Sequence, residues 1–191
     1  MTRLILASAS PQRKTLLAGL GLTFEVIPSA VEEDDHPESD PLQRSKDLAR
    51  LKAQDIERKH PGSVVIGCDT LVVASDGTLL EKPASPEDAK RMLLLQSGRT
   101  SVVHSAVCVV DSHGKAYEDV SSSSVTFKKL TEEEIIWWVR TKLWEGRSGG
   151  FQIDGPGQLM ISHIEGDWTS IVGLPVFLTG KLLREAGFPV L

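Results

Sequence analysis

The stretch from Leu4 to Leu20 combines several local signals and constrains the fold more than any other part of the chain. It opens with a short apolar run, Leu4–Ala7, which is typical of a buried strand. Ser10 then stands where a helix N-cap is expected, and Pro11 follows at the first helical position, where its missing N–H is tolerated. The sequence therefore predicts a strand that leads through a loop of small residues directly into a helix.

The first turn of this helix carries two cations, against the usual preference. Arg13 and Lys14 lie near the positive end of the helix dipole, which disfavours them unless an anion rests on the exposed backbone N–H groups. Ser8, Ala9 and Ser10 leave room for such a ligand, and the two hydroxyls can donate to its oxygens. An ordinary exposed helix start fits the same residues, but the whole combination favours phosphate binding.

Composition restricts the class of protein. A length of 191 residues predicts one domain, 1–191, and the 40% hydrophobic and 25% charged fractions are those of a globular chain. A net charge of −5 argues against a general nucleic-acid binder, so any phosphate site must be a local pocket. Leu4–Ala7 is too short for the apolar part of a signal peptide, and no apolar run reaches the length of a membrane span. We therefore expect a cytoplasmic protein whose partners include neither a membrane nor a nucleic acid polymer.

The most apolar segment, Val64–Val73, predicts a buried strand interrupted by one carboxylate. Burial of Asp69 is unfavourable unless the side chain is paired, hydrogen-bonded or bound to a metal, so a structural and a catalytic carboxylate are both open interpretations. Cys68 in this run, and Cys108 in another apolar run, have no metal-ligand spacing and are expected to be reduced core thiols.

An amphipathic helix is expected over residues 42–58, with a lysine inside its apolar stripe. Lys52 stands four residues from both Leu48 and Ile56. Its side chain can follow the stripe and reach water, or it can point into a site. The pattern alone leaves both alternatives open.

Two loops have compositions compatible with ligand binding. The run Glu32-Glu33-Asp34-Asp35 suits either a solvated surface or a divalent cation. Further along, several glycines between positions 146 and 157 surround Gln152 and Asp154. Such a segment suits either a backbone that closes over a ligand or a plain surface loop.

Strands and helices alternate along the chain, which favours an α/β or mixed sheet. The remaining elements are expected at Phe24–Pro28 (strand), Ser85–Gln96 (helix), Val102–Val110 (strand), Val125–Phe127 (strand), Thr131–Leu143 (helix with a capping box), Gln158–Ile164 (strand) and Leu174–Glu185 (helix).

Seven short motifs occur in the order and spacing of the Maf family, which the chain resembles from end to end. They are Ser8-Ala9-Ser10-Pro11 with Arg13, Glu33, Lys52, Gly67-Cys68-Asp69-Thr70, Lys82-Pro83, Ser97-Gly98-Arg99 with His104, and Ile171-Val172-Gly173-Leu174-Pro175. Each motif alone is weak, whereas seven together make a specific match. The resemblance implies an α/β fold with a mixed elongated sheet flanked by helices, and two lobes with a central cleft.

The resemblance also implies an activity, namely hydrolysis of a nucleoside triphosphate between its α- and β-phosphates, with a divalent metal such as Mg²⁺ or Mn²⁺. By this resemblance Asp69 is the proton acceptor that activates water, Lys82 belongs to the catalytic set, and Glu33 joins Asp69 at the metal. The phosphate-binding group comprises Ser8, Arg13 and Lys52, with Ser10 and Lys14 added because of the helix start described above. A polyanionic reaction centre does require cations, together with a carboxylate that accepts the proton of water.

Three positions are expected to select the base. Members that resemble the dTTP/UTP group carry Arg, Thr and Gln there, and those of the 7-methyl-GTP group carry an aromatic residue, Gln and Glu. Here the positions hold Gln12, Thr70 and Asp154. Thr70 matches the pyrimidine group and Gln12 matches neither, whereas the carboxylate of Asp154 only accepts hydrogen bonds and suits the N–H donors of guanine. The leading prediction is dTTP and UTP, with 7-methyl-GTP or another modified purine nucleotide as the alternative.

A function of a different class is also open, because the family has been linked to septum formation. The chain could be a non-catalytic nucleotide-binding regulator of cell division, a reading that loss of the carboxylate or of the cations would favour. No such loss is seen. The sequence does not determine the oligomeric state, and a homodimer is one alternative.

Overall fold

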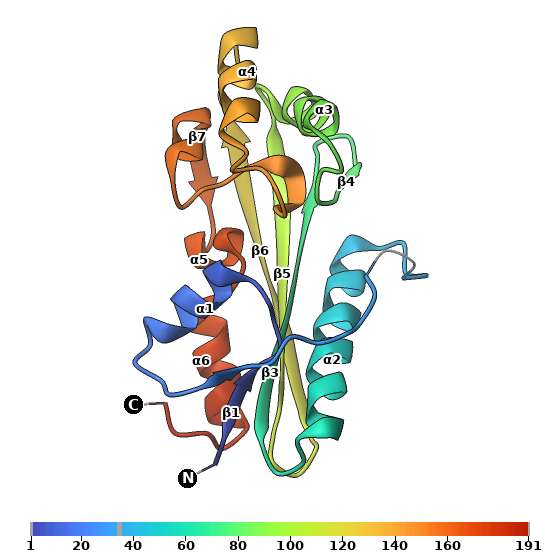
Figure 1. The fold of residues 1–191 in the computed structure, drawn as a ribbon, viewed down its shortest axis with the longest axis vertical. Helices are drawn as coiled ribbons and strands as arrows, with labels where there is room; N and C mark the ends of the chain where they lie inside the picture. Colours follow the sequence, from blue (N-terminus) through green and yellow to red (C-terminus); the bar gives the residue numbers. More distant parts are fainter. Residues whose placement is uncertain (1, 34–35, 191) are drawn as a thin grey trace. The chain divides into compact units, whose positions relative to one another are not determined.

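The computed structural model describes residues 2–33 and 36–190, which form a mixed α/β fold (Figure 1). The strands are β1 (Leu4–Leu6), β2 (Glu25–Val26), β3 (Val64–Val73), β4 (Leu79–Leu80), β5 (Thr100–Val110), β6 (Ala116–Phe127) and β7 (Ile161–Glu165). The helices are α1 (Pro11–Ala18), α2 (Pro41–Lys59), α3 (Pro86–Gln96), α4 (Glu132–Thr141), α5 (Trp168–Val172) and α6 (Val176–Glu185), with short 3₁₀ turns at Ser148–Gly150 and Pro156–Met160. Within the described residues the strands form one seven-stranded sheet in the order β2-β1-β3-β5-β6-β7, with β4 paired to β3.

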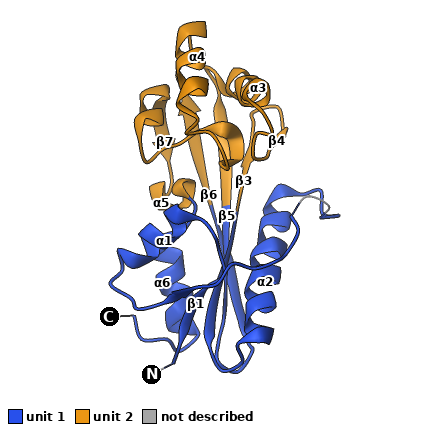
Figure 2. Ribbon diagram, viewed as in Figure 1, with its two compact units in different colours: residues 1–69, 105–121, 173–191 blue, residues 70–104, 122–172 orange. Residues whose placement is uncertain are grey.

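The chain divides into two compact units (Figure 2). Unit 1 comprises residues 1–69, 105–121 and 173–191, and unit 2 comprises residues 70–104 and 122–172. Asp69 is therefore the last residue of the first segment of unit 1, and Thr70 begins unit 2.

Unit 1 has a hydrophobic core on each face of its strands. β1 pairs in parallel with both β2 and β3. Because side chains alternate along a strand, Leu4 and Leu6 pack with Leu17, Leu182 and Leu183 of α1 and α6, and Ile5 packs on the other face. That second face is covered by α2 through Ala49, Ala53 and Ile56. The predicted sheet flanked by helices is confirmed.

Unit 2 is organised around a third core that includes Phe127, Trp138 and Phe151. The capping box predicted at Thr131 is present, because Thr131 accepts from the Glu134 N–H while Glu134 accepts from the Thr131 N–H.

Within the described residues no helix combines the length and the apolar character that a membrane crossing requires.

Two predicted strands are present, but they begin at other residues than expected. The strand expected at Gln158–Ile164 begins only at Ile161, because Gly155 and Pro156 start a 3₁₀ turn in which the Gln158 N–H donates to the Gly155 carbonyl at 3.0 Å. The strand expected at Val125–Phe127 begins already at Ala116. Its serine-rich part has a weak strand propensity, but β6 pairs with β5 on one side, and Ser124 pairs with Glu165 of β7 on the other.

The helix starts and the two cysteines agree with the sequence. Ser10 caps α1 by accepting from the Arg13 N–H, and Pro11 occupies the first helical position. Cys68 and Cys108 are free and buried, and burial raises the pKa of these thiols to about 11 and about 12.

Candidate active site

The loop between β1 and α1 is closed by the side chain of Arg13. Ser8 is buried, and its hydroxyl accepts from the Arg13 Nη1 at 3.1 Å and from the Ser10 N–H at 3.2 Å. Arg13 Nε donates to the Gly173 carbonyl at 2.9 Å, which ties the loop to the segment before α6. Fixed in this way, the guanidinium holds a defined position within unit 1.

The other predicted residues of this helix start are more exposed. Lys14 is exposed, and Gln12 is half-buried. The Gln12 amide oxygen accepts from the Ser10 hydroxyl at 3.2 Å, so one capping residue contacts both Gln12 and the backbone of Arg13. Ser8, Ser10 and Arg13 are thus brought together, whereas Lys14 makes no contact with them that would fix its side chain.

Lys52 and Asp69 form a buried ion pair in unit 1. The Lys52 Nζ lies 2.6 Å from Asp69 Oδ1 and 2.8 Å from Glu33 Oε1. Lys52 is only 5% exposed and Asp69 only 3%. The alternative in which Lys52 follows its helix surface to water is wrong, because the ammonium is needed to compensate a carboxylate that has lost its hydration.

A glycine two residues before Asp69 permits this contact. A Cβ on Gly67 would lie 2.1 Å from the Ala49 carbonyl oxygen and 2.7 Å from the Ala53 nitrogen, so no side chain fits between β3 and α2. Because Lys52 stands on the same helix between Ala49 and Ala53, the close approach brings its Nζ within reach of Asp69. Gly67 thus serves the geometry of the site without offering a functional group.

The second oxygen of Asp69 is an orphan. Oδ2 is buried and has no hydrogen-bond partner among residues 2–33 and 36–190, although such groups in native proteins almost always have one. A hard divalent cation, a water molecule or a transferred proton would each satisfy it. Within residues 2–33 and 36–190 no three His, Cys, Asp or Glu side chains are clustered for a metal. Two carboxylates, Glu33 and Asp69, do converge on Lys52, and Asp34 and Asp35 of the predicted acidic loop lie outside the described residues.

A metal therefore fits these residues only in a partial shell. Mg²⁺ is commonly held by one or two carboxylates, and substrate phosphates and water supply its other ligands. The buried, unpartnered Oδ2 of Asp69 and the neighbouring Glu33 carboxylate are compatible with that donor set.

The glycine-rich segment of unit 2 is held rigidly. Gly149 and Gly150 have φ angles of +74° and +67°, and a Cβ on Gly149 would lie 3.1 Å from a Val72 methyl group. The Gly149 carbonyl accepts from the Gln96 amide, and the Gly150 carbonyl accepts from the Trp138 indole, each at 2.8 Å. Both donors are fully buried, so the segment is a fixed loop and the interpretation as a plain surface loop is wrong.

This loop is also bonded to the neighbours of two predicted site residues. The Ser148 hydroxyl donates to the Thr70 carbonyl at 3.3 Å, and the Gly149 N–H donates to the Glu81 carbonyl at 3.0 Å. Thr70 follows Asp69 in the chain, and Glu81 precedes the exposed Lys82. The loop therefore has a defined position relative to Thr70 and to the backbone beside Lys82.

Asp154 and Gln152 have different environments. Asp154 Oδ1 lies 3.5 Å from Nη1 of Arg147, and both side chains are partly exposed. The amide oxygen of Gln152 is buried without a partner, and a Cβ on Gly155 would lie 2.8 Å from it. Gln152 is therefore packed beneath the loop, whereas Asp154 has a charged neighbour and access to solvent.

The family of Maf-like proteins matches residues 3–186. A protein of Deinococcus radiodurans named dTTP/UTP pyrophosphatase is 43% identical over 185 residues, which cover 97% of this chain and 93% of that protein. The chain belongs to the Maf-like family. A Pyrococcus furiosus protein of the same name is 37% identical and covers 96% of this chain and 95% of its own length.

Among solved structures, a nucleoside-triphosphatase/dITP/XTP pyrophosphatase from Mycobacterium abscessus is similar, with a TM-score of 0.46 and 15% identity. The matched region covers 68% of this chain and 76% of the Mycobacterium abscessus chain.

Some residues that shape the Maf-like site were missed by sequence reasoning. Gln96 and Trp138 were not assigned to the loop, although a glutamine on the apolar face of a helix, beside Met92 and Leu93, is a signal of a buried hydrogen bond. Arg147 was not singled out as the partner of Asp154. No local pattern reports that contact, because the two residues lie seven positions apart and the loop turns between them.

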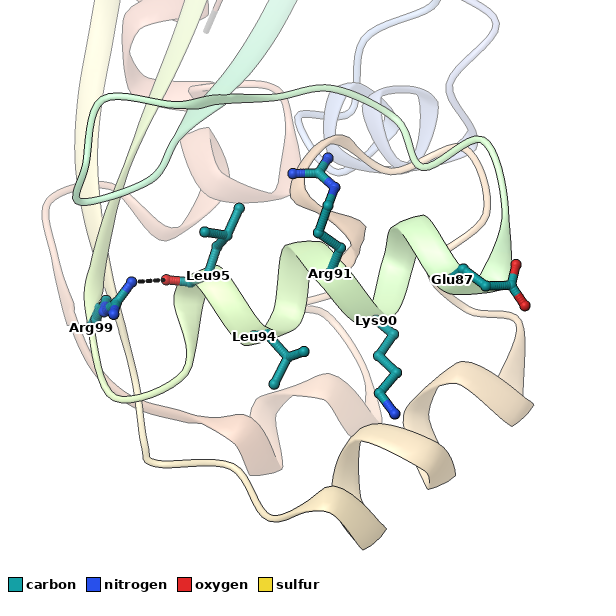
Figure 3. A pocket seen from close by; sticks show the side chains of 6 residues that line it. All are labelled: Glu87, Lys90, Arg91, Leu94, Leu95 and Arg99. Carbon is teal, nitrogen blue, oxygen red and sulfur yellow. Dashed lines mark hydrogen bonds between the residues drawn. The ribbon is translucent and has the colours of Figure 1, made fainter.

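Unit 2 has a surface hollow beside α3. It has a volume of about 430 Å³ and is lined by Glu87, Lys90, Arg91, Leu94, Leu95 and Arg99 (Figure 3). Arg91 is engaged by Asp88 at 2.8 Å, and Arg99 donates to the Leu95 carbonyl at 3.3 Å. None of the predicted catalytic, phosphate-binding, metal-binding or base-selecting residues lines this hollow, although Arg99 belongs to one of the seven motifs.

Proposed function

We propose that this Maf-like chain hydrolyses dTTP and UTP to the nucleoside monophosphate and pyrophosphate. The support comes from relatives named dTTP/UTP pyrophosphatase that match nearly the whole chain. The single structural observation that carries the proposal is the buried Asp69, whose Oδ1 is neutralised by Lys52 while Oδ2 has no partner. Such an oxygen is a suitable acceptor for the proton of an attacking water.

The proposed reaction is an in-line displacement at the α-phosphorus. The water oxygen forms a bond to the α-phosphorus, the bond from that phosphorus to the oxygen bridging to the β-phosphate breaks, and pyrophosphate leaves with the electron pair. Asp69 Oδ2 accepts the proton of the water. Lys52 holds the carboxylate by its other oxygen, which fixes the orientation of Oδ2 for this transfer.

Cations of unit 1 would bind the triphosphate. Arg13 is fixed by Ser8 and by the Gly173 carbonyl, and it lies in the first turn of α1 together with Lys14. Backbone N–H groups at this helix start and the hydroxyls of Ser8 and Ser10 would add further donors. Lys52 has its contacts with Glu33 and Asp69, which favours a role in holding these carboxylates beside its role toward phosphate.

A divalent cation, Mg²⁺ or Mn²⁺, would be held by Asp69 and Glu33. When bound, it neutralises charge on the phosphates and orients them for attack. Both residues face Lys52 with one oxygen each, which brings the two carboxylates together beside the same ammonium group.

The test is pyrophosphate release by purified protein with Mg²⁺ or Mn²⁺, measured across dTTP, UTP, CTP, GTP and 7-methyl-GTP. We expect release from dTTP and UTP, and loss of release when the metal is removed with a chelator. No release from any nucleotide by folded protein would overturn the enzyme proposal, and retained binding would then favour the regulator.

A second substrate class is favoured by one observation, the carboxylate at position 154. A carboxylate suits the N1–H and N2–H₂ donors of guanine, and it would also attract the positive charge of a 7-methylguanine. Preferred hydrolysis of 7-methyl-GTP over UTP in the same panel would support this alternative.

A further inference from the structure

Arg147 is the residue that most changes the chemistry of the predicted base-selecting position. Its Nη1 lies 3.5 Å from Asp154 Oδ1, and the two side chains are 20% and 25% exposed. The carboxylate therefore does not act as an isolated anion. One of its oxygens and one terminal nitrogen of the guanidinium face each other, and the second oxygen and the other N–H groups of Arg147 are left for a further partner.

The backbone that carries Arg147 is anchored on both sides. The Arg147 N–H donates to the Trp144 carbonyl at 3.2 Å, and the Arg147 carbonyl accepts from the Gly150 N–H at 3.0 Å. Directly after it, Ser148 is bonded to Thr70, and Gly150 is bonded to the buried indole of Trp138. A charged pair on such a fixed loop presents its groups in one orientation, which is a requirement for recognising a hydrogen-bonding pattern.

We propose that Arg147 is a specificity-determining residue that turns Asp154 into a paired donor and acceptor for the base of dTTP and UTP. The inference rests on the proposed function. Uracil and thymine present an N3–H donor beside the O4 acceptor. The free oxygen of Asp154 accepts from N3–H, and an N–H of Arg147 donates to O4, so the ion pair offers the two groups that a single glutamine amide would offer.

Without Arg147, the same position would have the opposite preference. A lone carboxylate repels O4 of uracil and accepts instead from the N4–H₂ group of cytosine, which stands at the corresponding place. UTP and CTP have the same size and the same phosphates, and they differ only in this edge. The ratio of their kcat/KM values therefore isolates the contribution of Arg147.

The experiment measures this UTP/CTP ratio for the unmodified protein and for Arg147→Met, which keeps an unbranched apolar stem. We expect the ratio to fall about tenfold or more in the variant, as for the loss of one hydrogen-bonding pair to a base edge. Arg91→Met is the matched control, because it breaks another arginine–aspartate pair of unit 2, with Asp88, away from the loop. The control is expected to keep the ratio of the unmodified protein.

A double variant separates recognition from a merely structural role. In Arg147→Met with Asp154→Gln, the amide supplies both groups by itself, so the UTP preference is expected to return. A structural defect caused by Arg147→Met would not be rescued by a change at position 154. The same cycle measures Arg147 in the Asp154→Gln background, where its removal is expected to leave the ratio unchanged.

The outcomes distinguish this inference from the proposed function. An unchanged ratio in Arg147→Met, with UTP still hydrolysed, overturns the role of Arg147 and leaves the enzyme proposal intact. A lowered ratio that Asp154→Gln does not restore also overturns it, because Arg147 would then act through the fold. Failure of the unmodified protein to release pyrophosphate from any nucleotide overturns the proposed function and this inference with it.

Discussion

Two ion pairs, one in each unit, differ mainly in burial. Lys52 and Asp69 are at most 5% exposed and lie 2.6 Å apart, whereas the side chains of Arg147 and Asp154 are 20% and 25% exposed and lie 3.5 Å apart. The first pair has lost its hydration, so each charge depends on the other. The second keeps part of its hydration and contributes little to stability, so it can change with the substrate. We infer that the buried pair belongs to the chemistry common to all nucleotides and the exposed pair to the choice among them.

The largest expected effect is the loss of turnover when the buried carboxylate of Asp69 is replaced by an amide. Asp69→Asn should lower kcat for UTP by about 10²–10⁴-fold, the range typical of a general base, because an amide cannot accept the proton of water. Nucleotide binding, measured by equilibrium titration without turnover, should change far less. Turnover close to that of the unmodified protein would remove Asp69 from the mechanism.

Removing the cation of the buried pair tests how much the pair contributes to the stability of the fold. Lys52→Met leaves a carboxylate buried without compensation and should lower the free energy of unfolding by about 3–5 kcal/mol, measured by urea denaturation. Adding Asp69→Asn should recover a large part of this loss, because no net charge then remains buried in the pair. A double variant no more stable than Lys52→Met would show that the loss comes from packing.

The close approach of α2 to β3 can be tested at a position without a functional group. Gly67→Ala would place a Cβ at 2.1 Å from the Ala49 carbonyl, so the helix must move. We expect a loss of stability of about 1–3 kcal/mol, with a fall in kcat that follows the displacement of Lys52 from Asp69. As a control, Gly180→Ala changes a helical glycine whose added Cβ would meet only the end of the Arg184 side chain, at 3.6 Å. If kcat falls no more than in the control, the close approach of α2 to β3 does not determine turnover.

The smallest expected effect is the change in the free energy of unfolding when the partly exposed pair of Arg147 and Asp154 is broken. Arg147→Met should change the free energy of unfolding by less than about 1 kcal/mol, because a partly solvated ion pair gains little over hydrated charges. Urea denaturation beside Lys52→Met gives the comparison directly. A loss as large as that of Lys52→Met would contradict the distinction between the two pairs.

Local signals in the sequence predicted much of unit 1 correctly. The cap at Ser10 followed by Pro11 is a local device, so its helix start could be read directly. Asp69 stood out because a carboxylate in an apolar strand needs a partner. The strand near Ile161 was placed too early, because the 3₁₀ turn that precedes it depends on how Gly155 and Pro156 are held, which hydrophobic pattern does not report.

The sequence by itself determined the strand-to-helix start at Ser10, the buried strand with its lone carboxylate, and the resemblance to the Maf family. Each of these depends on residues close together in the chain or on motifs in a fixed order. Only the tertiary structure decided that Lys52 pairs with Asp69 rather than reaching water, and that Arg147 neutralises Asp154. Those contacts depend on how closely α2 approaches β3 through Gly67, and on a loop held by Gln96 and Trp138. The physical reason is that the energy of a charge is set by its burial and its neighbours, which are properties of the packed chain.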